Sequence, residues 1–162
     1  YNKVNTFKEL QSVYMTDITG SKELSDIIIR YSNKYQLNPT LLLALIKTES
    51  NFNSNAVNYN YNGTIDRGLC QLNSNTFSGY TKEQFFDPEF NVDKAAEFLK
   101  WCLSQSENNV IIALAYYNAG IGTVFNESVG ETTLNYINKI IENMSIYDEE
   151  LKFLSDKMGI MG

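Results

Sequence analysis

The residue of this chain whose position best suits acid–base chemistry is Glu49. It closes the stretch LLLALIKTES, which is apolar over most of its length. In a helix, Glu49 lies four residues from Leu45 and three from Ile46, so it shares a face with side chains that must be buried. Burial disfavours the charged form of a carboxyl group and raises its pKa, and the negative end of the helix dipole acts in the same direction. Glu49 is therefore a candidate general acid.

A simpler interpretation of Glu49 also fits the local sequence. The residue can be exposed at the helix end and pair with Lys47 or with a nearby amide. Periodicity alone favours this simpler interpretation, so the choice between the two depends on the rest of the chain.

The composition excludes several other kinds of site. There is no histidine, which excludes Ser-His-Asp and Cys-His catalysis and any histidine-bound metal. Cys70 and Cys102 lack the spacing of metal ligands, and they are either a disulfide pair or two buried free thiols. The formal net charge is −6 and no Lys/Arg cluster is present, so a nucleic-acid partner is not expected. Nothing in the sequence requires a metal or a cofactor.

The elements that must position Glu49 are predicted to be helical. The 162 residues form most simply one domain, with 43% hydrophobic residues, two prolines and many segments of 3.6-residue period. Asn38 and Pro39 provide a cap and a first-turn proline for the helix that carries Glu49, and Ser21 caps the helix before it. Residues 51–68 are rich in Asn, Tyr and Gly, which predicts a long loop after the Glu49 helix.

Further helices are expected beyond this loop. GLCQLNSNTF predicts a short helix, DPEFNVDKAAEFLKWCLSQ a longer one, and NNVIIALAYYNAG a third that stops at Gly120. A helix over about residues 132–143, which bears Leu134, Ile137, Ile140 and Ile141, precedes a short polar helix at the C-terminal end. No apolar run reaches the length needed to cross a membrane.

Three short motifs follow one another along the chain. The first is Glu49-Ser50 at the end of its apolar helix, the second is GLCQL at residues 68–72, and the third is YNAG at residues 117–120. In this order and spacing they resemble the soluble lytic transglycosylase (SLT) family of the lysozyme-like superfamily, whose second motif usually reads Gly-Leu-Met-Gln. The resemblance runs from about residue 24 to 141, and NYNYNGTIDRG and FFDPEFNVDKAA are similar to the secretion- and conjugation-associated branch. It implies a mainly α, lysozyme-like single domain with a long loop after the catalytic helix.

The resemblance also implies an activity, that of a peptidoglycan lytic transglycosylase. Such an enzyme cleaves the β-1,4 bond between N-acetylmuramic acid and N-acetylglucosamine. Glu49 would be the single catalytic acid/base, which first protonates the glycosidic oxygen. It would then take a proton from the muramyl C6 hydroxyl, whose oxygen closes on C1 to give a 1,6-anhydro product. The motifs assign substrate binding to Ser50, Gln71, Tyr117, Asn118 and Tyr136.

Some of these assignments have simpler alternatives. Ser50 is expected to support the helix end rather than react, because no base is present to activate it. Gln71 can be an exposed amide, and Tyr117 and Asn118 can be a core residue and a helix cap. Around Tyr136 the chain departs from the family pattern, which has a glutamate four residues before that tyrosine. Here Thr132 occupies that place and the nearest glutamate, Glu131, is five residues before Tyr136, so either a bulge restores its role or the role is absent.

Two other functions stay open from the sequence. A lysozyme-type hydrolase, or muramidase, needs a second carboxylate, and the candidate is Asp66, just before RGLCQLN. An aspartate at that place is also well suited to cap the next helix, which is the interpretation we favour. A non-catalytic glycan-binding module with the same fold is the other alternative. The presence of Glu49, Gln71 and Asn118 together favours the enzyme.

The motifs suggest how the chain is organised and where it acts. We expect an N-terminal extension or packing helix over residues 1–20, the catalytic domain over residues 21–145, and a C-terminal tail helix over residues 146–162. The expected partners are peptidoglycan glycan strands and an envelope-spanning secretion or conjugation machine, with the protein itself a monomer. With peptidoglycan as the implied substrate, we expect an exported protein of the cell envelope or extracellular space. The chain starts at Tyr1 without a signal peptide, so the signal or anchor is expected to lie outside this chain.

Overall fold

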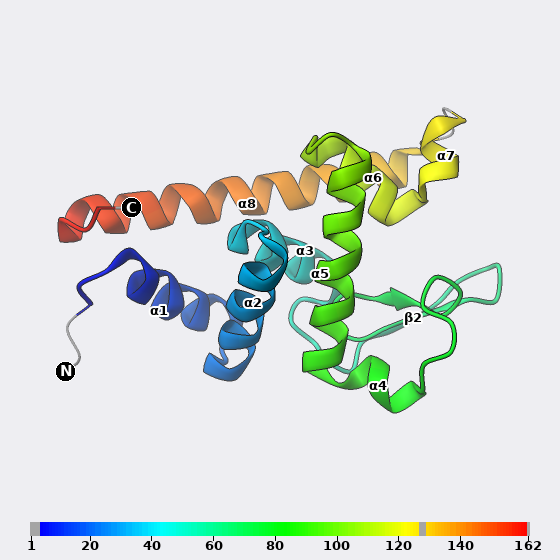
Figure 1. The fold of residues 1–162 in the computed structure, drawn as a ribbon, viewed down its shortest axis with the longest axis horizontal. Coiled ribbons are helices and arrows are strands. Elements are labelled where there is room, and N and C mark those ends of the chain that lie inside the picture. Colours follow the sequence, from blue (N-terminus) through cyan, green and yellow to red (C-terminus); the bar gives the residue numbers. More distant parts are fainter. Residues whose placement is uncertain (1–3, 127–128, 162) are drawn as a thin grey trace.

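A computed structural model of the chain describes residues 4–126 and 129–161. One long helix, α8, follows the long axis of the molecule, and a small sheet lies at the opposite end from both termini (Figure 1). The helices are α1 (Phe7–Thr19), α2 (Lys22–Tyr35), α3 (Pro39–Ser50), α4 (Lys82–Phe86), α5 (Pro88–Gln105), α6 (Val110–Ala119), α7 (Ile121–Phe125) and α8 (Glu131–Met158). The strands are β1 (Val57–Tyr59), β2 (Ile65–Arg67) and β3 (Leu72–Asn73). Within the described residues, no helix combines the length and the apolar character that a membrane crossing requires.

The helix α3 begins and ends where the sequence predicted. The Asn38 Oδ1 atom accepts a hydrogen bond from the Thr40 backbone N–H at 3.1 Å, and Pro39 occupies the first turn. Every residue from Thr40 to Ile46 is buried, which makes α3 the central helix of the core. The helix that carries Glu49 is therefore surrounded by protein until its last turn.

The helix α5 forms within the segment DPEFNVDKAAEFLKWCLSQ, which the sequence predicted as a longer helix. Its buried residues include Val92, Ala95, Ala96, Leu99 and Leu103. This side packs against α2 and α6, so α5 crosses the middle of the molecule (Figure 1).

The two cysteines, Cys70 and Cys102, are both buried and both carry free thiols, so of the two alternatives that the sequence left open the structure has two buried free thiols and no disulfide between them.

The segment after α3 is more ordered than the predicted long loop. It contains β1 and β2, which pair antiparallel with Val57 opposite Arg67 and Tyr59 opposite Ile65. The strand β3 then pairs with β2 and places Asn73 opposite Asp66. The strands were missed because they are two or three residues long and have no alternating apolar pattern, so their pairing depends on the polar contacts described below.

The predicted short helix in GLCQLNSNTF is wrong. These residues form turns and β3, because Gly68 and Gln71 have positive φ angles of 81° and 51°, which a right-handed helix cannot contain. A Cβ atom on Gly68 would lie 2.2 Å from Asn91 Nδ2 and 2.4 Å from the Phe85 carbonyl oxygen. Glycine is therefore required both by the backbone angle and by the close approach of α4 and α5.

The two predicted C-terminal helices are one helix, α8, of 28 residues. No glycine or proline interrupts it, and Tyr147 and Leu151 extend the buried side that Ile137 and Ile140 begin. Of the apolar residues named for the predicted helix, Leu134 is 52% exposed. The predicted domain boundary at residue 145 falls inside this helix, and the division of the chain into three parts stays a prediction.

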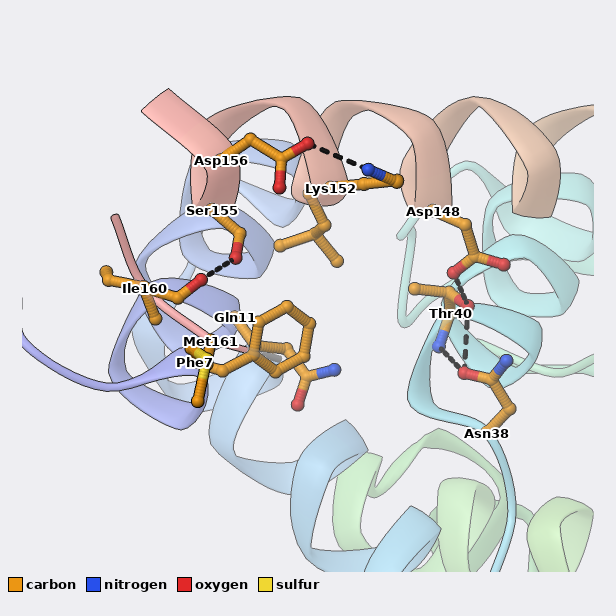
Figure 2. A pocket seen from close by; sticks show the side chains of 11 residues that line it. Phe7, Gln11, Asn38, Thr40, Asp148, Lys152, Ser155, Asp156, Ile160 and Met161 are labelled. Carbon is orange, nitrogen blue, oxygen red and sulfur yellow. Dashed lines mark hydrogen bonds and ion pairs between the residues drawn. The ribbon is translucent and has the colours of Figure 1, made fainter. Parts of the chain in front are cut away.

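The second half of α8 packs against the beginning of α3 and against α1. Figure 2 shows the Thr40 hydroxyl between Asn38 and Asp148, and it donates to Asp148 Oδ1 at 2.6 Å. Leu151 is 2% exposed and forms part of a pocket of about 530 Å³ together with Phe7 of α1. The far end of α8 thus stabilises the start of the helix whose last turn carries Glu49.

Candidate active site

A polar groove of about 940 Å³ contains most of the residues that the motifs singled out. One wall comes from the small sheet and the turn between β1 and β2, and the other comes from the end of α6 and the start of α8. Amides and hydroxyls dominate the lining, with few apolar side chains. The lining residues are Glu49, Asn58, Asn60, Tyr61, Asn62, Thr64, Asp66, Gln71, Asn73, Asn75, Thr76, Phe98, Tyr116, Tyr117, Asn118, Ala119, Gly120 and Thr132.

Glu49 reaches the groove from the last turn of α3. It is half-buried, and its Oε1 atom accepts a hydrogen bond from the Tyr136 hydroxyl at 2.6 Å. Tyr136 lies one and a half turns into α8, so this bond joins two helices that are far apart in sequence. The alternative in which Glu49 pairs with Lys47 does not occur, because the Lys47 ammonium donates to Asn51 instead.

The environment of Glu49 raises its pKa to about 8. Burial is the largest cause, because it removes water from the charged form, and the nearby negative charge of Asp66 acts in the same direction. The Tyr136 hydrogen bond opposes both by stabilising the carboxylate. With a pKa of about 8, Glu49 holds its proton over most of the neutral range and remains able to lose it.

Asp66 lies on the sheet wall of the same groove, and two amides hold its carboxylate. Asn60 Nδ2 donates to one oxygen at 2.9 Å, and Asn73 Nδ2 donates to the other at 2.7 Å. Both amides also donate to the Thr64 hydroxyl oxygen at 3.0 Å. The favoured interpretation of the sequence, that Asp66 caps the next helix, is wrong. The strand β3 replaces the helix that was predicted to follow Asp66. Its carboxylate has a fixed orientation in the wall of the groove.

Gln71 lines the groove, but its amide nitrogen is already bonded to the backbone. Nε2 donates to the carbonyl oxygens of Ala56 and Gly68, both at 3.1 Å. An amide nitrogen has two hydrogens, so this pair uses its donor capacity and leaves Oε1 to accept from a ligand. Gln71 therefore fixes the turn after β2 and offers the groove an acceptor.

Tyr117 and Asn118 lie on the other wall, at the end of α6. The Tyr117 hydroxyl donates to the Cys70 carbonyl oxygen at 3.4 Å, and burial raises the pKa of this phenol well above its ordinary value. Asn118 is exposed, and its Oδ1 atom accepts from the Thr133 hydroxyl at 2.8 Å. That bond leaves the Asn118 amide hydrogens to a ligand in the groove.

Two of the residues that the motifs assigned to substrate binding, Ser50 and Tyr136, are not among the residues that line the groove. The Ser50 hydroxyl donates back to the Ile46 carbonyl oxygen at 3.3 Å, so Ser50 supports the helix end and does not line the groove. Glu131 is exposed at the first residue of α8, and no bulge brings it toward Glu49. Thr132 lines the groove in its place, so the glutamate of the family pattern has no counterpart here.

Asn91 is a residue that the sequence reasoning missed. It is fully buried in α5, where its amide donates to the carbonyl oxygens of Arg67 and Phe85 and accepts from the Cys70 N–H at 2.8 Å. The bonds to Arg67 and Cys70 hold the Gly68 turn against α5, and the bond to Phe85 joins α5 to the end of α4. A buried asparagine on an otherwise apolar helix face was the available signal, because a buried amide must find partners.

No three His, Cys, Asp or Glu side chains gather within the described ranges in a way that could hold a metal ion. The two carboxylates of the groove are each occupied by hydrogen bonds from tyrosine or asparagine. The groove thus presents one protonated carboxyl group among amides and hydroxyls.

Comparison with known proteins gives both a family and relatives. Residues 26–141 match the model of the Transglycosylase SLT domain. Membrane-bound lytic murein transglycosylase F of Haemophilus influenzae strain 86-028NP is 27% identical over 158 residues, which cover 90% of this chain and 31% of the relative. The protein of the same name from strain PittGG is 27% identical over 137 residues, covering 78% of this chain and 27% of the relative. The chain thus spans about a third of the length of these relatives.

Two solved structures share the fold. The 70 kDa soluble lytic transglycosylase SLT70 of Escherichia coli superposes with a TM-score of 0.67 at 20% identity, over 99% of this chain and 33% of that chain. An inactive mutant of lytic transglycosylase Slt from Pseudomonas aeruginosa gives a TM-score of 0.65 at 20% identity, over 92% of this chain and 31% of that chain. The mainly α, lysozyme-like fold class is confirmed, with the small sheet in place of the long loop.

Proposed function

This chain belongs to the Transglycosylase SLT domain family, and from that premise we propose that it is a peptidoglycan lytic transglycosylase that uses Glu49 as its single acid/base. The substrate is the β-1,4 bond between N-acetylmuramic acid and N-acetylglucosamine. The relatives named as lytic murein transglycosylases support this substrate class. They are about three times as long as this chain, so the activity is proposed for the chain itself.

The observation that carries the proposal is the state of Glu49. It is a half-buried carboxyl group with a pKa raised to about 8, and it opens on a groove lined by amides and hydroxyls. An uncharged sugar polymer suits such a lining, because amides can both donate to and accept from hydroxyl and N-acetyl groups. A protonated acid beside a bound glycosidic oxygen has the geometry that bond cleavage requires.

The residues of the groove have separate roles in the proposed reaction. Glu49 donates its proton to the glycosidic oxygen as the C1–O bond breaks, while the nearby charge of Asp66 favours the oxocarbenium-like state. The resulting Glu49 carboxylate is stabilised by the Tyr136 hydroxyl. It then accepts the proton of the muramyl C6 hydroxyl as that oxygen bonds to C1. Glu49 ends protonated, and no water is consumed.

A muramidase is the second candidate, and Asp66 is the residue that favours it. The carboxylate faces the same groove as Glu49 and is fixed by two amides, as a group that orients a water or attacks C1 would be. The products distinguish the two reactions. Mass analysis of muropeptide ends after digestion of purified peptidoglycan is expected to give 1,6-anhydro ends, whereas reducing ends would support the muramidase.

The direct test of the proposal is E49Q. Loss of the acid is expected to lower turnover of peptidoglycan by about 10²-fold or more. The amide keeps an oxygen to accept from Tyr136, so the fold is preserved. The raised pKa means that folded Glu49 holds a proton which the unfolded chain releases above its ordinary pKa, so the wild-type carboxyl group costs stability as the pH rises toward about 8. The melting temperature of E49Q at neutral pH should therefore be at least that of the wild type.

The outcomes of this test also judge the non-catalytic alternative. If the wild type and E49Q bind glycan strands equally and neither releases product from several cell walls, the chain is a glycan-binding module. If the wild type releases product and E49Q releases the same amount, Glu49 is not the acid.

The remaining expectations concern the surroundings of the enzyme. The named relatives are membrane-bound murein enzymes, which supports a place in the cell envelope for this chain as well. An envelope-spanning secretion or conjugation machine as a partner, and a monomeric state, remain predictions from the resemblance.

A further inference from the structure

The turn between β1 and β2 presents one aromatic side chain to the groove without any support from the rest of the protein. Tyr61 has a relative exposure of 114%, and it lines the groove. Within the described part of the chain, its ring takes part in no hydrogen bond and no ring contact. A side chain this exposed adds nothing to the core, and its place in the lining of the groove leaves its ring available to a ligand.

The turn that carries Tyr61 is held firmly on both sides of it. The Asn60 N–H donates to the Thr64 carbonyl oxygen at 2.9 Å, and the Gly63 N–H donates to the Asn60 carbonyl oxygen at 3.0 Å. The Asn62 Oδ1 atom accepts from the Thr64 N–H at 3.1 Å and from the Thr64 hydroxyl at 2.7 Å. The neighbours of Tyr61 on either side therefore have their side chains directed to Thr64.

Thr64 connects this turn to the centre of the groove. It is 6% exposed, and its hydroxyl oxygen receives the Asn60 and Asn73 amides that also hold Asp66. The position of the Tyr61 backbone is thus fixed by the same network that orients the carboxylate beside Glu49. A ring on a rigid turn binds a ligand with little loss of backbone entropy.

We propose that Tyr61 is a stacking platform for a sugar ring of the glycan strand, at a distance from the cleaved bond, and that it helps to select long strands. This inference rests on the proposed function. Pyranose rings have apolar C–H faces that pack on aromatic rings, while their hydroxyl and N-acetyl groups pair with amides such as Asn58 and Asn75, which line the same groove. The occupant is the glycan strand because the platform is continuous with the groove.

The same turn offers a matched control. Tyr59, two residues earlier on β1, is 78% exposed, yet it is not among the residues that line the groove. Both tyrosines are exposed and both lie on the same hairpin, so Y59A and Y61A should cost similar stability. A loss of glycan binding in Y61A alone would therefore report the groove and not the hairpin.

Binding is measured in an E49Q background, where the glycan stays intact. The probe is a set of peptide-free glycan strands of increasing length, prepared from peptidoglycan. Y61A is expected to raise the Kd for long strands about three- to tenfold, and less for short ones, whereas Y59A leaves it unchanged. Y61F keeps the ring and should bind as E49Q alone does. Equal Kd values for E49Q and for Y61A in that background, at every length, would overturn the inference.

A second measurement reports the contact directly. Trp101 is the only tryptophan of the chain, so Y61W combined with W101F places a single fluorophore at the tip of the hairpin. Addition of long strands should shift its emission to shorter wavelength, since a stacked sugar removes water from the indole. An unchanged emission at saturating strand would contradict the stacking.

Kinetics separate this inference from the proposed function. If wild-type protein releases no product from any wall, the proposed function fails. If it releases product and Y61A shows the wild-type KM on long strands, only the role of Tyr61 fails. The expected result is a raised KM with a smaller change in kcat, because the ring contacts the strand away from the reacting bond.

Discussion

At the scale of single residues, the pKa of Glu49 depends on two neighbours that act in opposite directions. Asp66 raises it through charge, and Tyr136 lowers it through a hydrogen bond to the carboxylate. Burial adds the largest increase. The acid is thus kept protonated by its surroundings, while one hydroxyl limits how strongly the proton is held, as a group that must both give and take a proton requires.

Because Asp66 and Tyr136 act on the pKa of Glu49 in opposite directions, substitutions of the two residues should shift the pH profile of kcat/KM in opposite directions. Because Glu49 must be protonated for the first step, kcat/KM should fall as the pH rises through about 8. This fall is the alkaline limb of the pH profile. D66N removes a charge that raises the pKa of Glu49, so this limb should move to lower pH. Y136F removes a bond that lowers it, so the limb should move to higher pH. The measurement is kcat/KM on one glycan strand from about pH 5 to 10.

The control for these profiles is the melting temperature of each variant at each pH, which excludes unfolding as the cause of a lost limb. The two variants share the same acid, so a difference between them reports the neighbours of Glu49. Limbs that move in the same direction, or that do not move, would contradict the assignment of Glu49 as the titrating acid.

At the scale of elements, the sheet wall of the groove depends on a turn held by buried polar contacts. Asn91 of α5 bonds to three backbone groups around the Gly68 turn, and Gln71 bonds to two more. The strands themselves are too short to be stable alone. The position of Asp66 opposite Glu49 is therefore set by contacts between the sheet and α5.

Gly68 and Gly79 allow the cost of backbone strain to be measured apart from the cost of a steric clash. Both have positive φ angles, but only Gly68 is crowded by neighbouring atoms. Gly68 has a φ of 81° and no room for a Cβ atom, while Gly79 has a φ of 89° and nothing within 4 Å. G79A should cost about 1 kcal/mol of unfolding free energy. G68A should cost about 3 kcal/mol or more, because the Cβ displaces Asn91 or Phe85. Urea denaturation of both variants measures the difference.

Turnover of peptidoglycan should also fall more in G68A than in G79A. Displacement of Asn91 releases the turn that carries Gln71, so G68A should lose turnover even below its melting temperature, while G79A keeps it. Equal unfolding free energies for the two variants would mean that the chain accommodates the extra carbon by moving, and that the turn is less firmly held than the contacts indicate.

At the scale of the whole molecule, α8 joins the candidate active site to the opposite end of the fold. Its first half carries Tyr136 to Glu49, and its second half buries Tyr147 and Leu151 against α1 and α3 (Figure 1). The contact of Thr40 with Asp148 fixes α8 to the first turn of α3 (Figure 2). Both ends of α3 therefore bond to the same helix.

This arrangement predicts that a substitution far from the groove destabilises the whole chain. L151A removes a side chain that is 2% exposed and should cost about 2–4 kcal/mol of unfolding free energy. F153A, on the same helix but 60% exposed, should change it by about 0.5 kcal/mol or less. Thermal and urea denaturation measure both. A wild-type stability for L151A would show that residues 146–162 are independent of the rest.

The sequence by itself determined the helices that carry the chemistry. Asn38 and Pro39 set the start of α3, the apolar run that follows set its burial, and the place of Glu49 in the last turn then follows from 3.6 residues per turn. The motifs identified the family, and most of the residues that they singled out line the groove. Caps and periodicity are local features, decided within a few turns of chain, and each motif is itself a short stretch of sequence.

Only the tertiary structure decided how those residues meet. The bond between Tyr136 and Glu49 spans 87 positions, and the one between Asn91 and Cys70 joins a helix to a turn. The small sheet, the exposure of Leu134 and the single helix α8 likewise depend on what packs nearby, which a local pattern does not contain. The pKa of Glu49 belongs to this second group, because the removal of water around a carboxyl group is a property of the folded surroundings and not of the glutamate itself.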